Sequence, residues 1–233
     1  MKRVLAALLA SSFCAGPFAQ HTEPGPAFEV KDERRADEAM RIIQTREIAI
    51  GRAAPGASHA LRLSVHVFRG GSWSEGQAEA AVLASARLLE QCRVSLSRAE
   101  LRVVEAPPRF RVYSTALSRE LLRRMPVGKP AIFFVDDTLN DPAFEAEAIG
   151  RANAATRPEL ADTIWVVHGA RDLPQVLAHE LVHLLSDSGA HSEEPENLAR
   201  AETSPRNTRL TDAQCELLRS QAQANGLLTK TQP

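Results

Sequence analysis

The sequence predicts a single α/β domain built on a twisted mixed sheet, with a long packing helix, a helix that carries a histidine motif, and a C-terminal helix. Alternating apolar residues in Leu61–Val67 predict a half-buried strand. Continuous apolar runs at Pro130–Val135 and Thr163–Val167 predict buried central strands. Helical patterns lie between and after these strands. Strands mixed with helices in this way indicate one α/β domain.

The first residues have the pattern of an export signal. Lys2 and Arg3 are followed by the apolar segment Val4–Phe13, and small residues allow cleavage after Ala19. The apolar segment is too short to span a bilayer, and no later segment is long enough. We therefore expect residues 1–19 to be a signal peptide and the mature chain to be periplasmic or secreted, without a membrane span.

The remaining chain divides into three parts. Residues 20–58 are expected to be an N-terminal extension or linker, in which the charged stretch Lys31–Arg46 forms a surface helix. Residues 59–225 are expected to form the compact domain. Residues 226–233 are expected to be a frayed C-terminal tail, with fraying from Asn225.

The early part of the domain shows clear element boundaries. In the first strand, His66 falls on the polar side, which predicts a surface residue. Gly70-Gly71 ends this strand, and Ser74 with Gln77 forms a capping box for a helix to about Cys92. Three further elements are expected, namely a strand at Leu101–Val104, a short strand at Phe110–Tyr113 and a basic surface helix at Ser118–Arg124.

The charge balance excludes some partners. The formal net charge is −1, and loss of Lys2 and Arg3 with the signal changes it to about −3. This charge gives no electrostatic basis for binding nucleic acid or an anionic membrane. We expect a monomer.

Cleavage of the signal removes Cys14 and leaves Cys92 and Cys215. Two cysteines in an exported protein indicate one disulfide, which would join the end of an early helix to the start of the last one. The alternative is a pair of buried free thiols.

The segment Leu177–His191 contains the motif His179-Glu180-Leu-Val-His183. Residues i and i+4 share one face of a helix, so both histidines can point at one metal ion. Glu180 lies about 100° round the helix and can reach a water on that metal. Asp172 with Gln175 predicts a capping box at the start of the helix. Gly189 is expected to adopt a left-handed conformation that ends it.

A turn after the helix would bring His191 to the same metal. Three histidines leave a fourth position open for water, which is the arrangement of a catalytic zinc site. Asp187 is the alternative third ligand. Zinc held by three neutral imidazoles would lower the pKa of its water toward about 7, and Glu180 would accept the proton as general base.

The chain after His191 contains Glu193, Glu194 and Glu196. They could accept hydrogen bonds from zinc-ligating histidines, although a solvated loop is the simpler role. Thr211 with Gln214 predicts a capped final helix that turns two neighbouring leucines, Leu217 and Leu218, inward.

From Leu61 to Leu218, the order of elements and the histidine motif resemble the metzincin group of zinc metallopeptidases. The resemblance implies that His179, His183 and His191 are zinc ligands and that Glu180 is the general base. It also implies a substrate-binding edge strand at Ile149, Gly150, Arg151 and Ala152. Asn197-Leu198-Ala199 is similar to the segment that forms the Met-turn beneath the metal in that group.

Two departures from the metzincin pattern concern the site. The usual spacing places a glycine at Ser186 and the third ligand at Gly189, so the loop here is two residues longer. Ala199 stands where the Met-turn methionine is expected. In addition, the transition-state tyrosine has no downstream counterpart, because Tyr113 is the only tyrosine.

These patterns predict an exported zinc-dependent metalloendopeptidase acting on peptide or protein substrates. The alternative is an exported zinc-binding protein of the same fold that has lost peptidase activity and serves as a binding or scaffold module. A third reading, a small α/β binding module without metal, makes the histidines incidental.

Overall fold

The computed structural model describes residues 39–52 and 54–231. The signal peptide expected at residues 1–19 and most of the stretch expected as a surface helix lie outside these residues. The described residues form one compact unit. The sheet of this unit includes Arg41–Glu47, which were expected in the N-terminal extension at residues 20–58.

The predicted mixed α/β fold is confirmed by a seven-stranded sheet in the order β1-β3-β2-β5-β8-β7, with β9 also paired to β2. Pairing is parallel among β3, β2, β5 and β8, and antiparallel for β1, β7 and β9. The strands of the sheet are β1 Arg41–Glu47, β2 His59–Phe68, β3 Val94–Glu105, β5 Ala131–Val135, β7 Ala146–Ile149, β8 Thr163–Val167 and β9 Leu228–Lys230. The short strands β4 Val112–Tyr113 and β6 Asp137–Thr138 pair separately.

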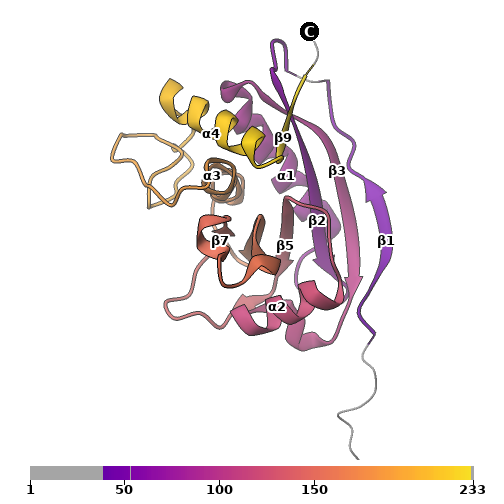
Figure 1. Cartoon of the computed structure of the whole chain (residues 1–233). Helices are drawn as coiled ribbons and strands as arrows, with labels where there is room; N and C mark the ends of the chain where they lie inside the picture. The colour runs from indigo at the N-terminus through magenta and orange to yellow at the C-terminus, as the bar shows by residue number, and fades with distance from the viewer. Residues whose placement is uncertain (1–38, 53, 232–233) are drawn as a thin grey trace, which may run out of the picture. The chain divides into compact units, whose positions relative to one another are not determined.

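Helices cover both faces of the sheet (Figure 1). The α-helices of the described residues are α1 Glu75–Leu89, α2 Thr115–Arg124, α3 Leu173–Ser186 and α4 Asp212–Ala224. Apolar residues of α1, α3 and α4 pack with one another and with one face of the sheet in a single core. Residues of α2 pack in a second core on the opposite face. The helix that bears the histidine motif, α3, is thus packed in the first core.

Several local predictions are confirmed. Ser74 and Gln77 form the capping box of α1, and Thr211 and Gln214 form that of α4. The disulfide Cys92–Cys215 joins the end of the short helix after α1 to α4, with a Cα–Cα distance of 4.8 Å. None of the helices described has both the length and the apolar character that a bilayer span requires.

Three predictions at the surface are wrong. Arg41–Arg46 belong to the edge strand β1 and not to a helix, because backbone pairing with β3 outweighs the helical spacing of the isoleucines. His66 is fully buried and stacks on Phe133 at 4.4 Å between ring centroids, because the second core covers that end of β2. Leu217 is 43% exposed, while its neighbour Leu218 is fully buried.

The C-terminal residues differ from the expected frayed tail. Gly226 takes a positive φ of 73°, which lets the chain reverse after α4. Leu228–Lys230 then form β9 against the start of β2, and Leu228 is buried in the first core. Strand pairing therefore orders the chain through Lys230.

Candidate metal centre and cleft

Helix α3 places His179 and His183 one turn apart beside the open edge of the sheet. The helix begins at Leu173, and Asp172 takes a left-handed conformation without a side-chain cap, so the predicted capping box is absent. The left-handed residue that ends the helix is Asp187, with φ of 48°, and not Gly189. The chain then turns and carries His191 back to the helix.

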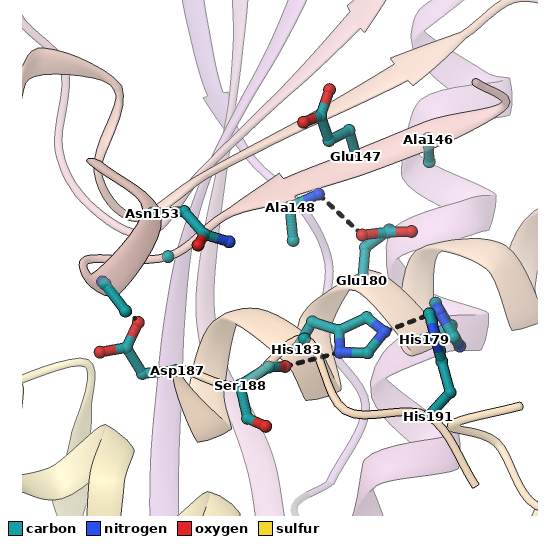
Figure 2. A pocket seen from close by; sticks show the side chains of 13 residues that line it. Ala146, Glu147, Ala148, Asn153, His179, Glu180, His183, Asp187, Ser188 and His191 are labelled. Atoms are coloured by element: carbon teal, nitrogen blue, oxygen red, sulfur yellow. Dashed lines mark hydrogen bonds between the residues drawn. The ribbon is translucent and has the colours of Figure 1, made fainter. Parts of the chain in front are cut away.

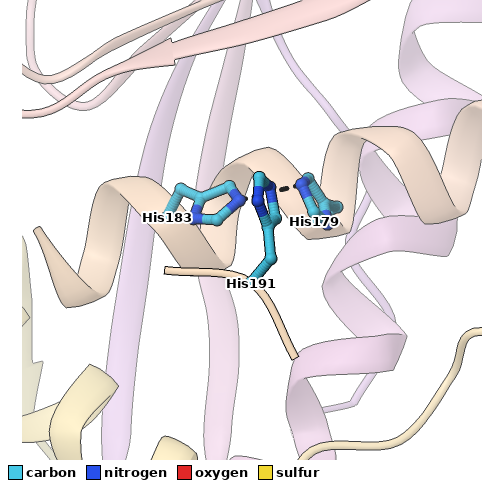
Figure 3. Close-up of side chains that lie close together, drawn as sticks. All are labelled: His179, His183 and His191. Carbon is cyan, nitrogen blue, oxygen red and sulfur yellow. Dashed lines mark hydrogen bonds between the residues drawn. The ribbon is translucent and has the colours of Figure 1, made fainter. Parts of the chain in front are cut away.

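The three histidines converge on one point (Figure 3). One ligand nitrogen from each of His179, His183 and His191 lies within 4.8 Å of the others. The rings of His179 and His183 are 4.3 Å apart between centroids, and His191 lies 5.4 and 5.0 Å from them. His179 is buried, His183 is half-buried and His191 is exposed. The structure therefore brings together the three residues predicted as ligands.

The hydrogen bonds of two rings fix which nitrogen faces the centre. His179 Nδ1 lies 2.8 Å from the carbonyl oxygen of Leu198, and His183 Nδ1 lies 2.7 Å from that of Ser188. A carbonyl oxygen only accepts, so each Nδ1 carries the proton and donates it. In a neutral ring, each Nε2 then presents a lone pair.

These two Nε2 atoms face each other at a separation of 2.8 Å. Burial lowers the pKa of His179 to about 4 and also lowers that of His183, so both rings are neutral near pH 7. Two lone pairs at this distance repel one another unless a cation lies between the rings. Neutral imidazoles whose other nitrogen donates to a carbonyl are the ligand form that zinc prefers, so the donor set fits this metal.

Asp187, the alternative third ligand, points elsewhere. Its Oδ1 accepts a hydrogen bond of 3.1 Å from the backbone N–H of Ala152. Figure 2 shows the Asp187 carboxylate directed away from the three histidines. A Cβ atom on Gly150 would lie only 2.6 Å from this oxygen. Among the residues described, the group that could hold a metal contains the three histidines and not Asp187.

Glu180 points from α3 toward strand β7 (Figure 2). Its Oε2 accepts a hydrogen bond of 2.7 Å from the backbone N–H of Ala148. Burial raises the pKa of Glu180 to about 7, the Ala148 N–H opposes this rise, and the nearby Glu147 adds to it. A cation held by the histidines would lower the pKa again by favouring the charged carboxylate.

A cleft opens on both sides of Glu180. One part, of about 240 Å³, lies between β7 and the end of α3 and includes all three histidines. The other part, of about 520 Å³, lies toward the start of α3 and also reaches His179 and Glu180. Strand β7 forms one wall of the cleft, and its outer edge is unpaired because β7 is the last strand of the sheet.

The edge strand predicted at Ile149–Ala152 lies earlier in the chain, at Ala146–Ile149. Gly150 and Ala152 line the cleft as expected. Ile149 is buried in the second core, and Arg151 bonds Asp162 and Asn225, so these two side chains do not face the cleft. Sequence reasoning missed Ala148, because its contribution is a backbone N–H that no residue type reveals.

The acidic residues after His191 do not contact the histidines. Glu193 and Glu194 contribute backbone carbonyls to Arg200, and Glu196 pairs with Arg209 at 3.8 Å. The carbonyl of Leu198 orients His179 instead, and Ala199 is buried next to it. The segment predicted to resemble the Met-turn therefore touches the site through its backbone.

No protein-family model matches the chain, and no curated protein sequence matches it. Among solved structures, the crystal structure of metalloproteinase-II from Bacteroides fragilis is similar, with a TM-score of 0.49 and 16% sequence identity. The match covers 76% of this chain, which spans 57% of the length of that one. A likeness at this level carries no functional information, so function rests on the geometry of the site.

Proposed function

We propose that the chain is an exported zinc-dependent metalloendopeptidase. The observation that carries this proposal is the convergence of three imidazoles beside the carboxylate of Glu180, in a cleft with an open strand edge. His179, His183 and His191 would hold the metal. When bound by three neutral imidazoles, zinc acts as a Lewis acid and lowers the pKa of a coordinated water toward about 7.

The residues of the chain supply the remaining functions. Glu180 accepts the proton of the attacking water as the peptide carbonyl is hydrolysed, and it returns a proton to the leaving amine. The unpaired edge of β7 can bind an extended peptide by adding it as a further strand. The N–H of Ala148 holds Glu180 in the absence of substrate. The carbonyls of Leu198 and Ser188 keep the histidine rings oriented.

Export is part of the proposal. The predicted signal at residues 1–19 supports it, and so does the disulfide Cys92–Cys215, because disulfides persist in oxidising compartments.

Replacement of the general base tests the catalytic role. Glu180→Gln should retain metal at the wild-type ratio and lose at least about 100-fold in hydrolysis of a quenched peptide, because general bases contribute on the order of 10²–10⁴. Glu196→Gln, on an exposed loop, is the matched control and should keep full activity. Wild-type turnover by Glu180→Gln would refute the assignment.

A second candidate is a zinc-binding protein of this fold without peptidase activity. The observation in its favour is that Tyr113, the only tyrosine, is fully buried in the second core and cannot reach the cleft. Metal binding with no chelator-sensitive hydrolysis of any peptide pool would favour this candidate. Absence of bound metal after refolding with zinc would exclude both.

A further inference from the structure

A hollow with a strong positive charge lies away from the histidine site. It is formed by strands β2 and β3, the residues before β5 and the turn into β9, and its volume is about 380 Å³. Its charged and polar side chains are those of Arg62, Ser64, Arg98, Glu100, Arg102 and Lys129. We call it the basic hollow. Four cationic side chains therefore surround one carboxylate, on a chain whose formal net charge is only −1.

The basic hollow and the cleft belong to opposite faces of the sheet. Successive residues of a strand point to opposite faces. Leu61, Leu63 and Val65 of β2 pack in the core that contains α3. Arg62 and Ser64, which alternate with them, must then point to the other face. A ligand in the basic hollow would not contact the histidine site.

The charges in the basic hollow are incompletely paired. Glu100 binds Arg98 at 2.8 Å and Arg102 at 2.7 Å, so its carboxylate is shared by two guanidinium groups, and Arg98 also pairs with Glu47 at 2.9 Å. Arg102 Nε is buried and has no hydrogen-bond partner. Arg62 makes no ion pair or hydrogen bond to any residue that the structure describes. Buried donors without a partner are rare in folded proteins, so Arg102 Nε requires an acceptor from outside the chain. Arg62 is exposed, and its donors are accessible to a ligand in the same hollow.

The strand register places like charges opposite one another. Arg62 pairs with Arg98 across β2 and β3. Two arginines directly opposite on neighbouring strands destabilise the sheet. An anion between them would convert this repulsion into attraction.

The floor and walls of the basic hollow also offer polar groups. Ser64 is buried, and its hydroxyl lies 3.3 Å from Nε2 of the buried His66. Lys129 Nζ donates to the carbonyls of Glu159 and Ala161, which fixes the ammonium group at the rim. Guanidinium groups form bidentate hydrogen bonds to the oxygens of tetrahedral oxyanions. The volume is in the range of small-molecule sites.

We propose that the basic hollow binds a phosphate or sulfate group carried by a small molecule. Arg62 and Arg102 supply the free donors, and Arg98 and Lys129 supply further positive charge. The proposal does not depend on the histidine site, because no residue of the basic hollow lines the cleft.

Calorimetric titration of the full chain with inorganic pyrophosphate and with sulfate tests the proposal. Sodium chloride at equal ionic strength is the reference. We expect one site that binds at least one of the two oxyanions. The oxyanion with the lower dissociation constant identifies the preferred group. Arg62→Ala should weaken this binding at least about tenfold, because a charge-assisted contact is lost. Arg87→Ala, an exposed arginine of α1 outside the basic hollow, is the matched control and should change it less than about twofold.

Thermal unfolding gives a second readout. Saturating oxyanion should raise the melting temperature of the wild type and of Arg87→Ala more than that of Arg62→Ala. The proposal is overturned if the wild type binds neither oxyanion better than chloride, or if Arg62→Ala and the wild type bind equally.

Discussion

At the residue scale, the neighbour of the unprotonated ring nitrogen distinguishes the buried histidines from one another. His66 and His179 are both buried, yet they differ in what faces their free nitrogen. His66 Nε2 has the hydroxyl of Ser64 as its neighbour and lies against Phe133. His179 Nε2 faces another imidazole nitrogen at 2.8 Å. Satisfied hydrogen bonds make the first a core residue, whereas the opposed lone pairs support the role proposed for the second as a metal ligand.

The buried His66 should make the protein sensitive to acid. Burial lowers its pKa to about 3, below the 6.5 expected in the unfolded chain. The unfolded state therefore takes up the proton first, and stability falls as the pH drops from about 6.5 toward 3. At pH 5 this loss should be about 2 kcal/mol relative to pH 7.5.

Replacement of this histidine by an uncharged ring isolates the effect. In urea titrations at pH 7.5 and pH 5, His66→Phe should show a smaller difference in unfolding free energy than the wild type, by about 2 kcal/mol. An unchanged difference would show that other groups cause the acid sensitivity.

We expect the position of Gly150 to tolerate no side chain, because Asp187 lies close to it. An alanine Cβ at this position would lie 2.6 Å from Asp187 Oδ1, and it would break the hydrogen bond between Asp187 and the Ala152 N–H. We expect Gly150→Ala to reduce the free energy of unfolding by about 1–3 kcal/mol.

Gly189, which lines the same cleft, provides a control. No atom lies within 4 Å of a Cβ built there, and its φ is not positive. Gly189→Ala should change the free energy of unfolding by less than about 0.5 kcal/mol in the same urea titration. Equal effects of the two substitutions would contradict this account of the Asp187 contact.

At the element scale, the buried strands, two of the three predicted capping boxes and the helix expected at Ser118–Arg124 are confirmed, whereas the surface helix expected over Lys31–Arg46 is wrong for Arg41–Arg46. The boxes at Ser74 and Thr211 formed as predicted, because each needs only residues within one turn. Asp172 matched the same pattern but took a left-handed conformation. Strand β1 was missed, because an exposed edge strand does not require alternating apolar residues.

Helix α4 offers a matched pair of leucines that tests its orientation. Leu218 is fully buried against the first core, whereas Leu217 is 43% exposed. Leu218→Ala should reduce the free energy of unfolding by about 2–5 kcal/mol, because it leaves a cavity. Leu217→Ala should cost less than about 1 kcal/mol by the same denaturant measurement. Similar costs for both leucines would mean that the helix is rotated from the position described.

At the scale of the whole molecule, the disulfide Cys92–Cys215 and the first core link α1, α3 and α4 into one support for the histidines. His179 and His183 come from α3, whereas His191 comes from a loop that α4 and the Asn197–Ala199 segment hold in place. Asn197 exchanges hydrogen bonds with Gln214 of α4. Metal binding should therefore be coupled to global stability.

Zinc should raise the melting temperature of the whole unit. Binding to the native state alone adds stability of about 2.7 kcal/mol when free metal exceeds its dissociation constant a hundredfold. Scanning calorimetry with zinc and then with a chelator should show this shift in the wild type. In His183→Ala the zinc-dependent shift of the melting temperature should be much smaller, because one of the proposed ligands is missing. Equal shifts in both proteins would place the metal elsewhere.

The sequence by itself determined the mixed α/β class, the central strands, the histidine helix and the cysteine pair, because each depends on local periodicity or on rare residue types. It also named the three histidines that converge. Only the tertiary structure decided that Asp187 turns to Ala152, that Ala148 holds Glu180, and that the carbonyls of Leu198 and Ser188 orient the imidazoles. Those contacts are made by backbone groups, which every residue carries, so their positions follow from the packing of distant segments and leave no mark in the order of side chains.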